Sequence, residues 1–564
     1  MIRAVKKKFK RWFAGSLNRE ITPDEIFLDS SNLPGFDTDQ FEGRLEKPIS
    51  QKVLLFLFFC FVLVILTFSS RIWFLQVEEG EAYLERSENN RLRHNLVFSN
   101  RGLIYDRTGL EIVSNTIHSG GEDFSLRHYK KIPGLSHLIG YVKYPERDSA
   151  GFYYQTDFVG KDGIEKSYGS TLLGENGLQL VETDALGNIY SQSTVKPPVD
   201  GQSLTLSIDS RVQSQLFKII AQTAEQFGFQ GGAAALMDVR SGELLALTSF
   251  PEFDSETLSL GSDVSLIDSL LSDPNKPFLN RAIAGLYAPG SIIKPFLAVG
   301  ALNEGIIDSQ KKIYSAGSLT LPNPYFPDKP SVFLDWKAHG WVDMAAAIAV
   351  SSNVYFYQIG GGYRDQKGLG ISGIEKYLKK FGLGEKTGID LPGEMKGVIP
   401  NPAWKEVQFK EEWRLGDTYN TAIGQYGLQV TPLQVLRGIA ALANDGLLLE
   451  STLLKRAQPK SSQDIQIKAI VFDTVKRGMR EAVKRGTASG LDVSFVKVAA
   501  KTGTAEVGKK FLNSWVVGFF PSDNPKFAFV VLMERGPRNN TIGGVYVMRQ
   551  LLDWMSLSTP EYLE

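Results

Sequence analysis

Cysteine is almost absent from this chain: Cys60 is the only one in 564 residues. Because Cys60 lies inside a long apolar run, the rest of the chain has no thiol for a disulfide bond or a thiolate metal site. An excess of one charge is absent too, since 62 Lys and Arg balance 62 Asp and Glu. Without a basic excess, the sequence predicts no nucleic-acid partner.

One segment lacks charge altogether. Residues 53–70 read VLLFLFFCFVLVILTFSS, and apolar residues resume after Arg71. This run predicts a single transmembrane helix over residues 53–75, with Trp73 at one interface. A cleaved signal peptide is the alternative, but the run is too long and no small-residue cleavage site follows it.

Residues 1–52 are polar, mixed in charge and interrupted by prolines, which predicts a mostly disordered cytoplasmic tail. The basic cluster at residues 6–12 favours a cytoplasmic N-terminus, where it can contact anionic lipid. We therefore expect everything after Leu75 to lie outside the cytoplasm.

A chain of this length should hold two or three domains. Short strand and turn signals over residues 76–205 predict an elongated mixed domain. Residues 206–564 predict an antiparallel five-stranded sheet flanked by helices, so the fold class is multi-domain α+β. The strand candidates are 232–238, 243–249, 495–505, 514–520 and 527–533, and the helical stretches lie near 292–304, 342–360, 371–381 and 431–444.

A serine and a lysine one helical turn apart, Ser291 and Lys294, follow a Pro-Gly turn and open an apolar run. Residues i and i+3 of a helix project to the same side. The lysine amine can therefore take the serine's proton if burial or a neighbouring cation lowers its pKa. Pro295 fits the first turn of such a helix, whose N-terminus would favour an oxyanion.

The Ser-x-x-Lys spacing also begins at Ser193, Ser309 and Ser494, so the spacing alone is not specific. Ser193 runs into two prolines, which cannot continue a helix. Ser309 lies in a polar turn, and Ser494 leads into a strand-like alternation. Only Ser291 has a turn followed by a buried helix.

Ser351 and Asn353 form a second candidate group, at the end of an apolar helix-like segment. A serine-lysine mechanism needs a second hydroxyl or amine to pass a proton to the leaving group. The same Ser-x-Asn pattern at Ser30 lies on the predicted cytoplasmic side, and the one at Ser87 precedes the catalytic region. Helix capping is the structural alternative for Ser351.

Residues 501–504, Lys-Thr-Gly-Thr, form the third group and lie in a strand-like alternation. The cation would bind a substrate carboxylate, and Gly503 would let a ligand backbone approach closely. The letters Lys-Thr-Gly recur at 386–388, but there they lie between a helix and a Pro-Gly turn. We expect Lys386 to be solvated.

In order, Ser291-x-x-Lys294, Ser351-x-Asn353 and Lys501-Thr502-Gly503 resemble the active site of penicillin-recognising serine transferases. The gap of 501 − 353 = 148 residues suits a penicillin-binding protein better than a β-lactamase. Other motifs resemble class B penicillin-binding proteins, closest to their elongation-type group, penicillin-binding protein 2. These motifs are Asn90-Arg91, 101–109 (RGLIYDRTG), Gly163-Ile164-Glu165, 387–394 (TGIDLPGE), 422–425 (AIGQ) and 430–434 (VTPLQ).

The resemblance implies a pedestal domain over residues 76–205, with a shortened head, and a transpeptidase domain over residues 206–564. It implies a peptidoglycan D,D-transpeptidase that cross-links stem peptides through an acyl-enzyme, releases D-alanine and acts in cell elongation.

A division-type (septal) transpeptidase and a non-catalytic β-lactam-binding scaffold are the alternatives. A non-catalytic scaffold could have lost a motif residue, but every motif residue is present in this sequence. A Ser-His-Asp hydrolase is disfavoured, because four of five histidines precede the catalytic region and Gly-x-Ser-x-Gly is absent.

The resemblance also implies a role for each residue. Ser291 would attack the carbonyl between two D-alanines, and Lys294 would take its proton. Ser351, with Lys501, would pass a proton to the departing D-alanine. Asn353 would hold the base and the substrate amide.

The substrate-binding residues implied are Thr502, Gly503 and Thr504. Thr502 and Thr504 would bind the terminal carboxylate alongside Lys501. The oxyanion would lie between the backbone amides of Ser291 and Thr504.

The implied location is the bacterial cell (inner) membrane, single-pass, with the catalytic domain outside. The implied partners are peptidoglycan stem peptides and lipid-linked glycan, β-lactams as covalent inhibitors, and a RodA-type SEDS glycosyltransferase of the elongation complex.

No cofactor is implied. Some relatives carry zinc after the nucleophile, but this region has His339 and no cysteine, so we predict no metal. Residues 424–427 read Gly-Gln-Tyr-Gly, a departure from the usual order that predicts an altered loop near the site.

Overall fold

The computed structural model describes residues 50–84, 92–116, 123–183, 189–323, 326, 328–456, 458–459 and 462–564. The chain divides into two compact units, Met1–Leu92 and Arg93–Glu564. Most of the predicted tail, its basic cluster and the Asn90-Arg91 motif lie outside the described residues. Ser30 and Ser87 lie outside them as well.

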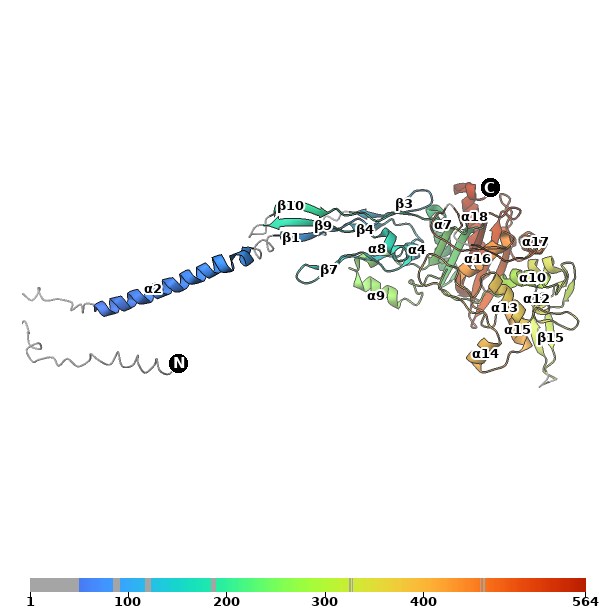
Figure 1. Ribbon diagram of the computed structural model, residues 1–564. Helices are drawn as coiled ribbons and strands as arrows, with labels where there is room; N and C mark the ends of the chain where they lie inside the picture. Colours follow the sequence, from blue (N-terminus) through green and yellow to red (C-terminus); the bar gives the residue numbers. More distant parts are fainter. Residues whose placement is uncertain are drawn as a thin grey trace, which may run out of the picture. The chain divides into compact units, whose positions relative to one another are not determined.

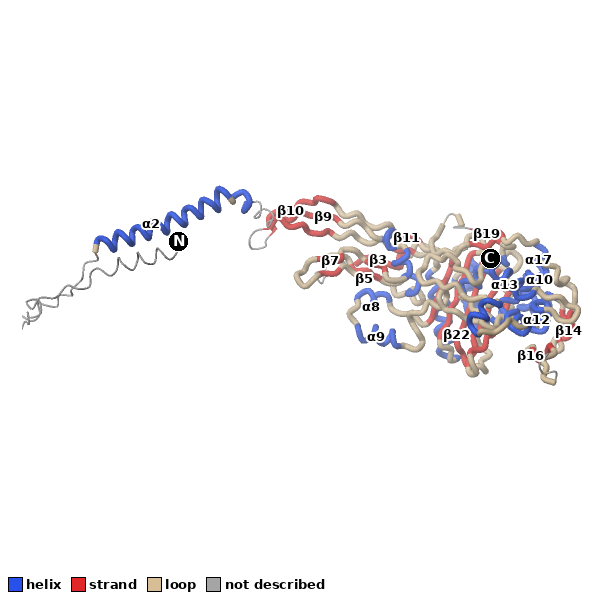
Figure 2. Tube along the Cα trace, turned by 60° about the horizontal axis from the view of Figure 1, so that its bottom comes forward, coloured by secondary structure: helices blue, strands red, loops and turns tan. Residues whose placement is uncertain are grey.

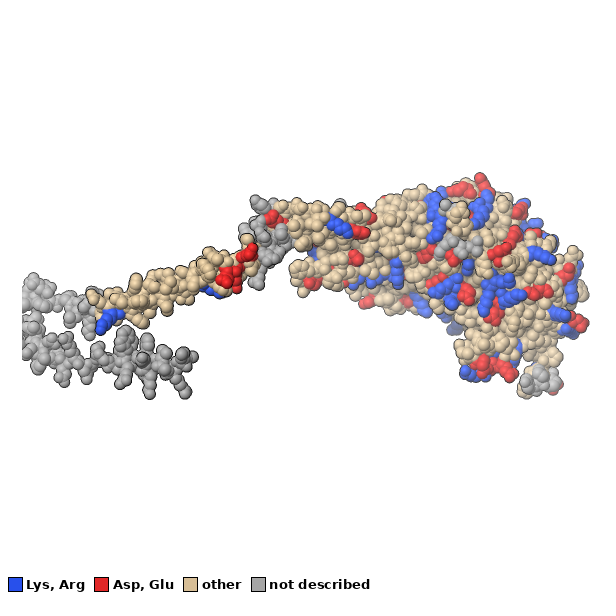
Figure 3. All heavy atoms as spheres, viewed as in Figure 1, with Lys and Arg blue, Asp and Glu red and all other residues tan. Residues whose placement is uncertain are grey.

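The predicted transmembrane helix is present as α2, Gln51–Trp73, which has no buried residue. It continues as one π-helical segment, η4, Phe74–Glu78. Together these 28 residues have a mean hydropathy of 2.8 in their most apolar window, so the helix is long and apolar enough to cross a membrane. Charged side chains gather only near its two ends (Figure 3).

The second unit begins with small sheets. One has the order β1-β9-β10 and another β11-β2-β3-β4. Two motif residues meet here, because the fully buried Glu165 carboxylate accepts hydrogen bonds from Arg101 Nε (2.6 Å) and Arg127 Nε (2.7 Å). The strands are β1 Leu92–Val97, β2 Ile104–Tyr105, β3 Glu111–Thr116, β4 Leu126–Tyr129, β9 Gly177–Thr183, β10 Ile189–Lys196 and β11 Leu204–Thr205. The shorter elements are α4 Ser136–Ile139, β5 Val142–Lys143, β6 Glu146–Arg147, β7 Tyr153–Gln155, β8 Val159–Gly160, α5 Gly163–Ser167 and α6 Gly169–Leu172.

The predicted five-stranded sheet is confirmed, with the order β13-β12-β22-β21-β20 and antiparallel pairing throughout. The strands are β12 Gly231–Asp238, β13 Leu244–Phe250, β20 Ala499–Val507, β21 Phe511–Phe520 and β22 Phe527–Pro537. Both faces of the sheet are covered, which explains why β12 reads as a continuous apolar run.

Helices α7, Ser210–Phe227, and α18, Gly544–Ser558, pack on one face of this sheet. Helices α10, Lys294–Asn303, and α16, Pro432–Ala443, pack on the other. Helix α10 lies beside α12 and α13 (Figures 1 and 2). The further helices are α8 Ser255–Leu260, α9 Val264–Ser272, α11 Met344–Ala349, α12 Asn353–Gly361, α13 Gly370–Lys380, α14 Pro402–Phe409, α15 Leu415–Ala422 and α17 Ala469–Arg485. The remaining small strands are β14 Ile313–Ser315, β15 Ser318–Leu321, β16 Ser331–Leu334, β17 Gly340–Val342, β18 Leu447–Leu449 and β19 Ser462–Asp464.

Two helical expectations need correction. The stretch near 342–360 is not one helix but two, α11 and α12, because Ser351 between them adopts a left-handed conformation with φ 61°. The helix expected near 292–304 starts as a 3₁₀ turn, η5, Gly290–Ile293, and becomes α-helical only at Lys294.

Candidate active site

Ser291 lies in η5, which two other segments hold in place. Gly290 donates its N–H to the carbonyl of Gly424 (2.9 Å). A Cβ added to Gly290 would come within 2.6 Å of the Thr504 carbonyl oxygen, and its φ is 59°. Only glycine allows this close approach. The turn before Ser291 is therefore seated directly against strand β20.

Lys294, three residues after Ser291, is fully buried. Its Nζ donates to the carbonyl of Ser351 (2.7 Å) and to Asn353 Oδ1 (2.7 Å). Burial lowers the pKa of Lys294 to about 7, although the charge of Asp335 acts to raise it. An amine with this pKa is substantially unprotonated at neutral pH, so it can act as a base.

Ser351 lies between two buried amines. Lys501 Nζ donates to Ser351 Oγ (2.8 Å) and to the Thr502 carbonyl (2.8 Å), and Lys294 Nζ is 3.4 Å from the same hydroxyl. Burial, and then the charge of Lys294, lower the pKa of Lys501 well below its usual value. Helix capping, the alternative role considered for Ser351, is performed by the neighbouring Ser352. Its hydroxyl accepts a hydrogen bond from the Tyr355 N–H in the first turn of α12.

One cleft of about 880 Å³ brings the three motifs together. Six of the eight predicted site residues line it: Ser291, Ser351, Asn353, Thr502, Gly503 and Thr504. The other two, Lys294 and Lys501, lie beneath its floor and reach Ser351. A Cβ on Gly503 would come within 2.8 Å of the Pro289 carbonyl oxygen, so this glycine lets β20 pass close to the nucleophile turn.

The decoy motif stays apart from this cleft. Residues 386–388 form a loop, and Lys386 is exposed, as expected. The reordered segment 424–427 does reach the site, since Gln425 and Tyr426 line the cleft. Tyr426 has φ 57°, and its ring contacts Trp404 and Trp413 edge to face.

Sequence reasoning missed Asp335, whose side chain is fully buried beside Lys294. Its Oδ2 accepts hydrogen bonds from Ser315 Oγ (3.1 Å), Ser352 Oγ (2.8 Å) and the N–H of Val354 (3.0 Å). Burial acts to raise the pKa of Asp335, but these hydrogen bonds and the Lys294 charge outweigh it and lower the pKa. No motif marks this aspartate in one sequence, because its hydrogen-bond partners come from two distant segments, at Ser315 and at Ser352 to Val354, and Lys294 lies on a third.

Asp335 fixes the start of α12, and therefore the position of Asn353. If the chain is acylated by penicillin, as the resemblance implies, we expect Asp335→Asn to slow that reaction by about tenfold to 100-fold, because small displacements of positioned groups are costly. Loss of the carboxylate charge also removes an influence that raises the Lys294 pKa, so the rate–pH midpoint should move to lower pH. Acylation rates measured across pH test both effects. Asp473→Asn on α17 is the control, and an unchanged midpoint with a normal rate contradicts this positioning role.

No group of three or more His, Cys, Asp and Glu that could hold a metal occurs within the described ranges. His339 Nε2 lies 3.6 Å from Asp335 Oδ1, and these two side chains do not form a group of three.

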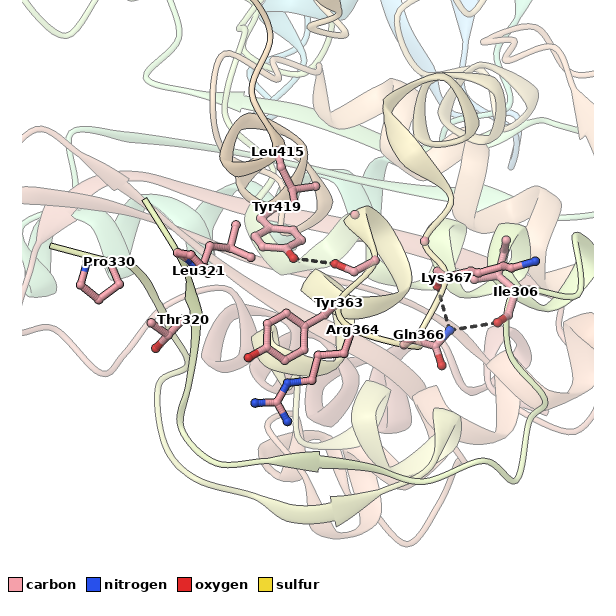
Figure 4. Close-up of a pocket in the computed structure, with 14 residues that line it drawn as sticks. Ile306, Thr320, Leu321, Pro330, Tyr363, Arg364, Gln366, Lys367, Leu415 and Tyr419 are labelled. Atoms are coloured by element: carbon pink, nitrogen blue, oxygen red, sulfur yellow. Dashed lines mark hydrogen bonds between the residues drawn. The ribbon is translucent and has the colours of Figure 1, made fainter. Parts of the chain in front are cut away.

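A larger hollow, of about 1020 Å³, lies at the opposite end of α12 (Figure 4). None of the eight predicted site residues lines it. Tyr419 Oη donates to the Gly362 carbonyl (2.5 Å), and Gln366 Nε2 donates to the Ile306 carbonyl (3.0 Å). These two hydrogen bonds hold the loop that follows α12. Because this larger hollow contains none of the predicted site residues, cavity size alone does not identify the catalytic cleft.

The fold and site define a penicillin-recognising serine transferase with an N-terminal pedestal. Residues 232–548 match the penicillin binding protein transpeptidase domain, and residues 122–206 match the penicillin-binding protein dimerisation domain. The first match covers more than half of the chain, which belongs to the class B penicillin-binding proteins. The resemblance inferred from the motifs is confirmed.

Individual relatives carry the names MrdA and PBP2. The chain is 34% identical over 442 residues to the peptidoglycan D,D-transpeptidase MrdA of Acinetobacter baumannii, covering 73% of this chain and 63% of that protein. It therefore spans just under two thirds of that relative's length. The solved structure of Pseudomonas aeruginosa PBP2 in complex with WCK 5153 is 29% identical, with a TM-score of 0.70, over 84% of this chain and 98% of that one. Helicobacter pylori PBP2 in complex with MreC is 26% identical, with a TM-score of 0.70, over 82% and 99%.

Proposed function

We propose that this chain is an elongation-type peptidoglycan D,D-transpeptidase. The observation that carries the proposal is the Ser351 hydroxyl shared by two buried amines, Lys294 and Lys501, in the cleft that Ser291 lines. An activated serine with a second proton carrier is what acyl transfer from a peptide requires. The names of the A. baumannii and P. aeruginosa relatives support the same reaction.

In the acylation step, Ser291 Oγ attacks the carbonyl carbon between two D-alanines. Lys294 already donates two hydrogens to the Ser351 carbonyl and Asn353 Oδ1, so its lone pair is available for the serine's proton. The C–N bond then breaks, and Ser351, backed by Lys501, passes a proton to the departing D-alanine. An amine of a neighbouring stem attacks the resulting ester and releases Ser291.

Strand β20 supplies the substrate-binding groups. Thr502 and Thr504 bind the terminal carboxylate together with Lys501, and Gly503 leaves room for the substrate backbone. The N–H groups of Ser291 and Thr504 stabilise the oxyanion. Thr502 is oriented by a hydrogen bond from its Oγ1 to Thr487 Oγ1 (2.6 Å), and Thr487 is a further cleft residue that sequence reasoning missed.

The pKa of Lys294 sets the expected pH dependence. Below pH 7 the amine is protonated and cannot accept the serine's proton; above it, the free amine predominates. We expect the acylation rate by a labelled penicillin to rise about tenfold per pH unit below 7 and to level off above it. A rate that stays constant between pH 5 and 9, with the protein folded throughout, contradicts a basic role for Lys294.

We assign residues 76–205 to the pedestal and residues 206–564 to the transpeptidase domain. The N-terminus lies in the cytoplasm and the cleft outside the membrane. By analogy with the H. pylori complex with MreC, we propose an MreC-like scaffold as one partner. The resemblance to elongation-type class B proteins supports a RodA-type glycosyltransferase as the other.

Labelled penicillin tests the enzyme proposal directly. The full-length protein in detergent should form one stable adduct, on Ser291. Absence of any adduct favours the non-catalytic scaffold instead. Depleting the protein in its own cells separates the two enzymatic roles, because rounded cells indicate elongation and filaments indicate division.

A further inference from the structure

Strand β20 extends the cleft beyond the three motifs. Its residues alternate, so Thr502, Thr504 and Glu506 project from the same face, and all three line the cleft. Glu506 is the only carboxylate among the residues lining the cleft. No proposed step of the reaction uses it.

The direction of the donor peptide follows from the proposed function, on which this inference rests. With its terminal carboxylate at Thr502 and its reacting carbonyl at Thr504, the upstream part of the peptide runs towards Glu506. Among the described strands, β20 is the end strand of its sheet, so an extended peptide can lie along its free edge. Thr504 and Glu506 are about 7 Å apart along the strand. The side chain of the residue just upstream of the two D-alanines can span that distance.

Glu506 does not stand alone at this end of the cleft. Its Oε1 accepts a hydrogen bond from an Arg538 terminal nitrogen (2.6 Å), and both side chains are more than half exposed. The turn between β20 and β21 adds Lys509 and Lys510, and Arg535 follows on β22. Among these cations, Arg538 is the one shown in contact with Glu506, and such a pair of opposite charges suits a ligand side chain with one ammonium and one carboxylate.

We propose that Glu506 and Arg538 bind the third residue of the donor stem, a diamino-dicarboxylic acid whose side chain ends in both an ammonium and a carboxylate. The ammonium pairs with Glu506 and the carboxylate with Arg538, so each charge of the pair finds a partner of opposite sign. A lysine side chain carries only the ammonium and leaves Arg538 without a new partner. The pair therefore selects the diamino-dicarboxylic donor over a lysine donor.

A protection assay tests this selection with the full-length protein in detergent. Three pentapeptides ending in D-Ala-D-Ala carry meso-diaminopimelate, lysine or norleucine as third residue, and each competes with a labelled penicillin for acylation. We expect the diaminopimelate peptide to halve the labelling rate at a concentration about tenfold lower than the lysine peptide. The norleucine peptide should be the weakest competitor.

The variants Glu506→Gln and Arg538→Gln should each remove most of the diaminopimelate advantage. Their penicillin labelling without peptide should match the unaltered protein, because penicillin lacks this side chain. Glu225→Gln on the exposed face of α7 is the matched control and should keep the advantage.

The outcomes are distinct. Equal protection by the diaminopimelate and lysine peptides, no protection by any peptide, or an advantage that survives both variants overturns the inference and leaves an ordinary surface ion pair. Absence of penicillin labelling in the unaltered protein instead overturns the proposed function.

Discussion

Replacing Ser291 by alanine is expected to abolish covalent labelling by penicillin. The stable adduct is an ester, and in the proposed mechanism Ser291 alone carries the acyl group, while Ser351 only transfers a proton. We expect the labelling rate to fall at least about 10⁴-fold, to background. Gel fluorescence and intact-mass measurements on the full-length protein follow the adduct.

The chain provides a matched control for this variant. Ser309 has the same spacing to Lys312 but lies in a turn outside the cleft, so Ser309→Ala should label normally. Ser291 is partly exposed, so its substitution should barely change the unfolding temperature. A Ser291→Ala protein that is still labelled at the original rate rules out this nucleophile.

Replacing Lys294 by methionine is expected to slow acylation by about 10²–10⁴-fold. Methionine has a similar length and no proton-accepting amine, so Ser291 keeps its surroundings but loses its base. Rapid-mixing measurements with excess labelled penicillin give the rate constant of acylation. Raising the pH should restore little of the rate, because the group that titrates near 7 is gone.

Lys312→Met is the control here, since Lys312 is the lysine of the decoy pair and does not line the cleft. Methionine at 294 leaves Asn353 Oδ1 and the Ser351 carbonyl without their donor, so the melting temperature must be measured alongside. A folded Lys294→Met protein with a near-normal acylation rate assigns the base to another group.

Features encoded by neighbouring residues were predicted well. The uncharged run predicted α2, and strand-like apolar runs, some continuous and some alternating, predicted all five strands of the main sheet. Strand β20 begins at Ala499 rather than near 495, because its partner β21 ends at Phe520 and the pair of Ala499 is Phe519. In this register β21 extends only one residue past the partner of Ala499, so residues 495–497 have no partner in β21.

Features that depend on distant contacts were not predicted. Lys501 and Ser351 are 150 residues apart, and only their motifs indicated that they would meet. Asp335 and Thr487 belong to no motif, and they join the site through hydrogen bonds to other segments. The break at Ser351 is local, because the polar run Ser351-Ser352-Asn353 interrupts the apolar pattern and the Ser352 hydroxyl caps α12.

A structure of the benzylpenicillin adduct tests the central claim most directly, with the full-length protein in detergent. We expect an ester on Ser291 Oγ, with its carbonyl oxygen about 3 Å from the backbone nitrogens of both Ser291 and Thr504. Lys294 and Lys501 should still meet at Ser351 beside it. An acyl group on another residue would contradict Ser291 as the nucleophile, and a carbonyl oxygen out of reach of both nitrogens would contradict the proposed oxyanion site.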